Sequence, residues 1–344
     1  MIRLLVAGAT WAGGHDVVQM SHAWRRGVNS FYTTGGDNHT LLSLEEHKGF
    51  GTSEVWVQHP DWVADECKGC QHPDWKTRPD CPFPEHCGWC GQTNHGCRFH
   101  EQRYVITPSL ANQTFFSDYD WMLYADAETI WFHDNVVDMV SKLNPDDPWY
   151  ISESMFPTSN SNCVFPGREP VKHDGCIYSP SPDPFCTPST ILNASTCAWA
   201  TAEHKDGRAN PKAPGQVWNG GNWGFIVSRG AMARITPEQW RDCVECKNDF
   251  HGCYGGGDCR LGECMWRHGV APTLPDRDYS IPGIDGYRLG EVDADSFIAY
   301  LRDHKTGCDD VCKRTLRNPL ALNVRTTKQM AQLEVALYEV KKAM

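Results

Sequence analysis

The sequence has no run of apolar residues long enough to span a bilayer and no excess of basic residues. A membrane-spanning helix needs about 20 consecutive, mostly apolar residues, and the 344-residue chain contains no such stretch. Lys and Arg number 32 against 43 Asp and Glu, which gives a net charge of −11. The chain therefore lacks the positive surface that binding to a nucleic-acid backbone requires, and we expect no nucleic acid among its partners.

Cysteine, by contrast, is abundant. The chain has 17 cysteines, too many for a reduced cytosolic protein unless most of them bind metal, so an oxidising compartment is the simpler interpretation. N-x-S/T sequons at Asn38, Asn112 and Asn193 are compatible with the secretory route, although such triplets often arise by chance. We therefore expect the chain to belong to the lumen of the secretory pathway, in the Golgi or the ER, or to be secreted.

Short apolar runs alternate with helical patterns and predict an α/β fold. The predicted strands cover residues 2–7 (ended by Gly8), 30–33, 54–57, 121–125 and 223–227, and the predicted helices cover 17–24 and 229–235. Strand, helix and strand in that order favour a parallel sheet with right-handed crossovers. We predict one domain over residues 1–344, built on a mostly parallel twisted sheet with helices on both faces.

Three segments depart from this pattern. Residues 60–100 hold six cysteines, and 156–214 are rich in Pro, Ser and Asn with four more, so both are expected to be inserted loops. Residues 325–344 carry apolar residues on one face of a predicted terminal helix. The first insert has a zinc-like spacing, but it resembles the small disulfide domains of plexins, semaphorins and integrins, and we favour disulfides. As a rival to an enzyme, this insert could serve as an interaction module.

An acidic pair follows the predicted strand 121–125. Side chains alternate along a strand, so Asp126 and Glu128 are expected to point to the same side where that strand ends. Ligands of open α/β sheets bind beyond the carboxyl ends of the strands. Two hard oxygen ligands at this place suit Mn²⁺ or Mg²⁺, which would hold the diphosphate of a nucleotide sugar.

Four blocks of the sequence resemble the fringe and core 1 β1,3-galactosyltransferase family. Residues 120–129, D-W-M-L-Y-A-D-A-E-T, are similar to the family's D-W-F-L-K-A-D-D-D-T, and residues 220–229, G-G-N-W-G-F-I-V-S-R, to its S-G-G-A-G-Y-V-L-S-R/K. Residues 256–270 resemble its E-D-V-x-x-G-x-C-L-x-x-x-G-V, and residues 22–32 its T-W-x-x-R-C-N-K-V-L-F. The blocks keep the family's order over about residues 2–290.

The resemblance implies a GT-A fold and inverting transfer of a hexose, galactose or N-acetylglucosamine, from a UDP-sugar to a hydroxyl of a glycan or glycopeptide. Asp126 and Glu128 would bind the metal, and Asp258 would be the general base, although capping a helix is its alternative role. The donor and acceptor would be bound by Asp126 together with Tyr124, Gly220, Gly221 and Trp223. Glycines at a strand start also serve packing alone.

The chain departs from the family at two points of the metal site. Ala127 and Glu128 replace two aspartates, and the family's histidine has no counterpart near residues 286–288. The alternative is therefore a catalytically inactive relative that acts as a chaperone or glycan-binding protein. Enzymes of this kind usually sit behind an N-terminal membrane anchor, which this sequence does not include, and a homodimer is possible.

Overall fold

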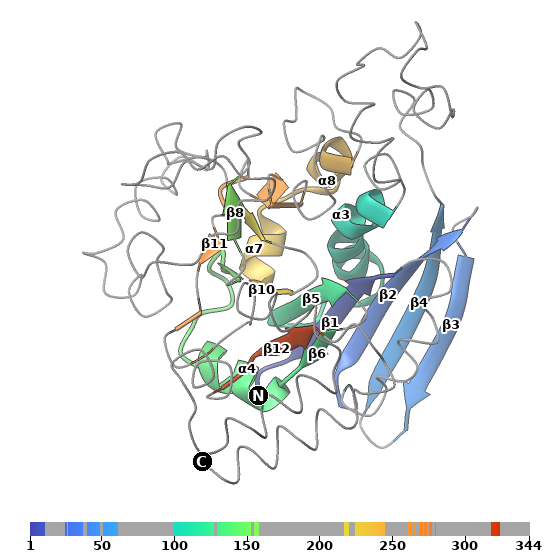
Figure 1. Ribbon diagram of the computed structural model, residues 1–344. Helices are drawn as coiled ribbons and strands as arrows, with labels where there is room; N and C mark the ends of the chain where they lie inside the picture. Colours follow the sequence, from blue (N-terminus) through green and yellow to red (C-terminus); the bar gives the residue numbers. More distant parts are fainter. Residues whose placement is uncertain are drawn as a thin grey trace, which may run out of the picture.

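The computed structural model is a mixed α/β structure around one eight-stranded sheet (Figure 1). It describes residues 1–10, 25, 27–36, 40–48, 51–60, 100–126, 129–152, 155–157, 217–219, 224–244, 261–262, 264–265, 268–270, 272–273, 275–276, 279 and 318–323. The predicted helix 17–24, the terminal helix 325–344 and nearly all of the two inserts lie outside these residues. No described helix is long and apolar enough to cross a membrane.

The large sheet has the strand order β11-β7-β10-β5-β1-β2-β4-β3. Its strands are β1 (Leu4–Ala9), β2 (Asn29–Gly36), β3 (Thr40–His47), β4 (Thr52–Pro60), β5 (Trp121–Asp126), β7 (Tyr150–Ile151), β10 (Phe225–Ser228) and β11 (Pro272–Thr273). β10 and β3 run antiparallel to their neighbours, and the others run in one direction. The predicted fold class, a mostly parallel sheet in an α/β structure, is confirmed.

The helices cover both faces of the sheet. α3 (His100–Leu110), α7 (Arg229–Ala233) and α8 (Pro237–Val244) lie above it in Figure 1, and α4 (His133–Val140) lies below. Two ribbons complete the described elements: β6 (Thr129–Trp131) pairs with β12 (Ala321–Asn323), and β8 (Met155–Pro157) pairs with β9 (Val217–Asn219). A π-helical turn, η3 (Ala111–Phe115), continues α3.

Alternation along the central strands builds two apolar cores. Met122 and Tyr124 of β5 pack into the core on the α3 face, whereas Trp121, Leu123 and Ala125 pack into the core on the α4 face. Successive side chains of a strand point to opposite faces, so a strand covered on both sides is apolar at nearly every position. Burying each large apolar side chain contributes about 1.5–3 kcal/mol, which fixes the central strands firmly.

Each of the predicted strands is present, but some of them begin or end at other residues than predicted. The strands predicted at 30–33, 54–57 and 121–125 are confirmed, and the strand predicted at 223–227 begins at Phe225. Gly8 was expected to end the first strand, yet β1 continues through it to Ala9. A Cβ at Gly8 would lie 2.6 Å from the carbonyl oxygen of Ala125, so the glycine allows β1 and β5 to approach.

Candidate functional site

Asp126 is the last residue of β5 and lies at the point where the strand order of the sheet reverses. The chain builds from β1 outward through β2 and β4 on one side, and β5 lies on the other side of β1. In the parallel register of these two strands, Asp126 is level with Ala9, the last residue of β1. Open α/β sheets bind ligands beyond the carboxyl ends of the strands at this kind of reversal. The backbone thus places Asp126 where the sequence predicted a ligand site, while its side chain, Ala127 and Glu128 lie outside what the structure describes.

Thr10 directly follows β1 at the same end of the strands, and its own hydroxyl is buried. Its backbone N–H donates to the carbonyl oxygen of Thr33 at 2.8 Å, so the chain leaving β1 stays beside β2. The side chain has no exposed surface, and its Oγ1 has no hydrogen-bond partner. A buried hydroxyl without a partner costs about 1–3 kcal/mol. The sequence analysis missed Thr10, because nothing in its neighbours distinguishes it from a structural threonine.

Gly224, in the glycine-rich block of residues 220–229, lies near the carboxyl end of β5. This residue has φ +91°, a conformation that side-chain-bearing residues rarely adopt, and a Cβ there would lie 2.8 Å from the ring of Trp131 and 3.1 Å from the Cβ of Ala125. Ser152 Oγ donates to its carbonyl oxygen at 3.2 Å. Gly224 thus lies against Ala125, the residue before Asp126. Gly220, Gly221 and Trp223 precede it but fall outside the described residues.

Tyr124 was expected to bind the donor or the acceptor, and the structure places it in the core instead. Its side chain has no exposed surface, and its hydroxyl donates to the carbonyl oxygen of Tyr104 at 2.6 Å. The ring packs against Tyr104 and Phe225, with centroids 4.8 and 5.0 Å away. Strand alternation explains the difference. Tyr124 points to the same face of β5 as Met122, and α3 covers that face. Tyr124 supports the strand and presents no surface to a ligand.

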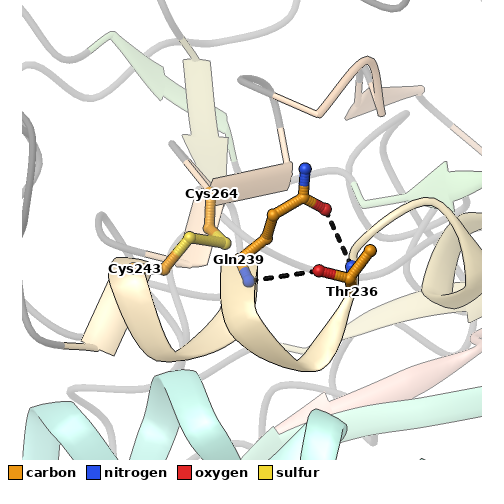
Figure 2. Close-up of a disulfide and its surroundings, with 4 residues drawn as sticks. All are labelled: Thr236, Gln239, Cys243 and Cys264. Atoms are coloured by element: carbon orange, nitrogen blue, oxygen red, sulfur yellow. Dashed lines mark hydrogen bonds between the residues drawn. A yellow bond between two sulfur atoms is a disulfide. The ribbon is translucent and has the colours of Figure 1, made fainter.

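The block that contains Asp258 is described only from Leu261 onward. Leu261, Cys264 and Met265 are fully buried in the core on the α3 face, the same core that holds Tyr124. Cys264 forms a disulfide with Cys243 of α8 (Figure 2). Asp258 itself lies outside the described residues, so its role as base remains a prediction, as does its alternative role as a cap.

The disulfide joins this segment to a helix whose start is well defined. Figure 2 shows Thr236 and Gln239 bonded reciprocally at the beginning of α8: Thr236 N–H donates to Gln239 Oε1 at 2.8 Å, and Gln239 N–H donates to Thr236 Oγ1 at 3.3 Å. This is a capping box. A crosslink across 21 residues stabilises the fold by about 3 kcal/mol in the chain-entropy model. The Cys243–Cys264 crosslink therefore holds the buried segment at residues 261–265 against α8.

Among the described residues, one group of three potential metal ligands lies close together. The ligand atoms of Cys243, Cys264 and His268 are within 4.8 Å of one another. Both sulfurs are used by the disulfide, so no thiolate is available there. For a hard divalent cation, the carboxylate of Asp126 at the sheet edge is the suitable ligand type.

An ion-pair network lies at the other end of the central strands, where β1 and β5 begin. Arg229 Nη1 and Arg3 Nη2 lie 2.8 and 3.0 Å from Asp120 Oδ1, and Arg3 N–H donates to Asp120 Oδ2 at 2.9 Å. Burial raises the pKa of Asp120, but hydrogen bonds and charge from Arg3, with the charge of Arg229, outweigh it, and the net pKa is lowered. This network joins the starts of β1 and β5 to the end of β10 and takes no part in the candidate site.

Comparisons with known proteins yield weak structural likenesses. No protein-family model matches the chain, and no curated protein matches it. Among solved structures, galactosyltransferase LgtC in complex with donor and acceptor sugar analogs is similar at 8% identity and a TM-score of 0.36, over 99% of this chain and 96% of that one. An active-site mutant of LgtC gives 8% identity and a TM-score of 0.40, over 96% and 95%. At these values we draw no conclusion from the likeness, and the described strand order alone establishes the fold class.

Proposed function

We propose that this protein is a metal-dependent glycosyltransferase of the GT-A kind, which uses a UDP-sugar as donor. The observation that carries the proposal is the position of Asp126 at the end of β5, level with the end of β1, where the strand order reverses. A carboxylate at that place suits Mn²⁺ or Mg²⁺, and such an ion offsets the charge that develops on a departing diphosphate.

One further observation supports a ligand at this edge. Trp223 is one peptide bond from Gly224, which lies against Ala125, so we infer that Gly220, Gly221 and Trp223 belong to the ligand site proposed at Asp126. An aromatic side chain there suits the C–H face of a pyranose.

In the proposed reaction each residue has a separate task. Asp126 and Glu128 would hold the metal, which would offset the negative charge of the donor diphosphate. Asp258 would remove the proton from the acceptor hydroxyl as that oxygen attacks the anomeric carbon from the side opposite the diphosphate. The acceptor is a hydroxyl of a glycan or glycopeptide, and the transferred sugar is galactose or N-acetylglucosamine. We place the reaction in the lumen of the secretory pathway, in the Golgi or ER, and the Cys243–Cys264 disulfide fits an oxidising compartment.

A thermal-shift experiment with UDP-sugars tests the donor and metal sites. A ligand that binds only the folded state at 100 times its Kd stabilises that state by about 2.7 kcal/mol. We expect UDP with Mn²⁺ to raise the Tm, and EDTA to remove the increase. Asp126→Asn should lose the increase, whereas Asp134→Asn, an exposed acid at the start of α4, should keep it. An undiminished Mn²⁺-dependent shift in Asp126→Asn would refute the proposed site.

A turnover assay separates the enzyme from its rival, a catalytically inactive chaperone or glycan-binding relative. Ala127 within the acidic triplet favours the rival, because it removes one potential metal ligand. The enzyme should transfer sugar to a glycan acceptor, and Asp258→Asn should bind UDP and Mn²⁺ while losing transfer. If the wild-type protein binds UDP with Mn²⁺ but transfers to no acceptor in a broad panel, the inactive relative is the better description.

A further inference from the structure

The sequon Asn112-Gln113-Thr114 lies in η3, at the edge of the sheet opposite Asp126. After η3 the chain runs to Asp120, whose N–H donates to the carbonyl oxygen of Arg3 at 2.9 Å, and then into β5. Trp121, the first residue of β5, is level with Leu4, the first residue of β1. The sequon is thus near the starts of these strands, whereas the proposed ligand site is at their ends.

One hydrogen bond fixes the orientation of the Asn112 carboxamide. The hydroxyl of Tyr119 donates to Asn112 Oδ1 at 2.7 Å. Tyr119 is almost fully buried, and burial raises its pKa, so the phenol keeps the proton that it donates. Oδ1 therefore faces the protein, and the geometry of the amide directs Nδ2 elsewhere.

The turn that carries Asn112 is largely exposed. Asn112 is half-buried, and its neighbour Gln113 is exposed. Ser117 and Asp118, a few residues further along the chain, are exposed as well. In the described part of the chain, Nδ2 of Asn112 is not among the buried polar atoms that lack a partner. The nitrogen that N-linked glycosylation modifies thus belongs to a half-buried side chain that is held by its oxygen.

We propose that Asn112 carries an N-linked oligosaccharide. The proposal rests on the secretory route proposed above and is independent of the transfer reaction. The donor is a lipid-linked oligosaccharide diphosphate, and the catalyst is the lumenal oligosaccharyltransferase. Nδ2 forms a bond to the anomeric carbon of the first sugar, the bond from that carbon to the diphosphate oxygen breaks, the diphosphate leaves with the electron pair, and Nδ2 loses one proton to the transferase.

The folded structure tolerates this modification. A glycosylated carboxamide keeps Oδ1 as an acceptor, so the hydrogen bond from Tyr119 is retained. Because η3 is at the edge opposite Asp126, a glycan there leaves the proposed nucleotide site open. The sugar would cover the exposed turn around Gln113, whose Nε2 already donates to Ser109 Oγ at 2.8 Å.

The test is to direct the full chain into the secretory pathway with an added signal peptide and to map glycans on the translocated protein. Peptide-N-glycosidase in ¹⁸O-water converts each occupied asparagine to labelled aspartate, which peptide mass spectrometry locates. Thr114→Ala removes the hydroxyl of the sequon but leaves Asn112 and its bond from Tyr119 in place, and Thr114→Ser restores a hydroxyl. The same spectra report Asn38 and Asn193 on the same molecules.

We expect labelled aspartate at position 112 in the wild type and in Thr114→Ser, and its loss in Thr114→Ala. An unmodified Asn112 peptide in translocated, protease-protected protein would overturn the proposal, whatever the state of Asn38 and Asn193. Label at position 112 that persists in Thr114→Ala would overturn it too. Sugar-nucleotide binding is measured separately, so failure here leaves the proposed function untouched.

Discussion

Individual residues at the two ends of β1 and β5 have opposite roles. At the start of these strands the carboxylate of Asp120 forms ion pairs with Arg3 and Arg229. At their end the hydroxyl of Thr10 is buried without a partner. A satisfied polar group stabilises the fold, and an unsatisfied one destabilises it. We therefore interpret the Thr10 hydroxyl as a group that costs stability.

Thr10→Val tests that interpretation. Valine has nearly the same shape and lacks the hydroxyl, so we expect the free energy of unfolding to rise by about 1 kcal/mol, because a buried unpartnered group is removed. UDP affinity should stay unchanged, because the buried hydroxyl presents no surface to a ligand. Urea unfolding and calorimetric titration measure the two effects.

Thr33→Val is the matched control on the neighbouring strand. Thr33 Oγ1 lies 2.5 Å from Thr107 Oγ1, so the same substitution breaks an existing hydrogen bond and should lower stability. If Thr10→Val destabilises the protein as much as Thr33→Val does, the Thr10 hydroxyl is hydrogen-bonded in the folded protein and the interpretation is wrong.

His133, the first residue of α4, predicts acid sensitivity. Burial lowers its pKa to about 4, and the charge of Asp134 opposes this only in part. The unfolded chain therefore takes up a proton near pH 6.5 and the folded chain does not, so this residue makes the folded state less stable as the pH falls from about 6.5 to 4. We expect His133→Gln to flatten the pH dependence of urea unfolding in that window, by roughly 1–3 kcal/mol. Identical slopes for wild type and variant would contradict the expected burial of the imidazole.

Among the elements, the central strands were the easiest to predict and the edge strand was missed. β5 is apolar at every position from Trp121 to Ala125 because both faces are covered, and such a run is evident in the sequence. β3 escaped prediction because Leu41, Leu42 and Leu44 are exposed and a register shift interrupts its pairing with β4. An edge strand whose leucines are exposed gives no clear apolar alternation to detect.

Asp120 links β1, β5 and β10 through its ion pairs, so its substitution should weaken the attachment of all three strands. We expect Asp120→Asn to lower the free energy of unfolding by about 1–3 kcal/mol at pH 7, because two hydrogen-bonded arginines lose their partner. The folded pKa is lowered, so the stabilisation is complete above the unfolded pKa of about 4 and is lost as the pH falls through the folded pKa. The difference between wild type and variant in urea unfolding should therefore shrink below about pH 4. Asp118→Asn, which removes the exposed partner of Arg3, should have little effect.

At the scale of the whole molecule, stability is concentrated in the middle of the sheet. β1, β5 and β10 are buried on both faces, whereas β3 is an edge strand with exposed leucines. We expect amide hydrogen exchange to be slowest in β1 and β5, which open only when the protein unfolds, and fast in β3, which opens locally.

UDP with Mn²⁺ should slow exchange in the central strands and leave β3 unchanged. A ligand of the folded state suppresses global unfolding by mass action but has no effect on local opening elsewhere. Exchange mass spectrometry measures both. Slow exchange in β3 without ligand, or protection by the ligand in β3 alone, would contradict this division.

The sequence by itself determined the fold class, the central strands and the position of Asp126 after one of them. These features depend on local patterns: an apolar run of strand length, its end, and the acidic residue that follows. The resemblance to a glycosyltransferase family added roles for Asp258, Glu128, Gly220, Gly221 and Trp223, which stay predictions.

The tertiary structure decided which residues meet. It put Ala9 level with Asp126, brought Gly224 against Ala125, joined Cys243 to Cys264, and placed Tyr124 under α3 instead of at the ligand edge. None of these follows from local pattern, because strand order and register depend on how distant segments bury one another's apolar faces. Thr10 shows the difference most clearly, since only the packing around it decides that its hydroxyl is buried without a partner.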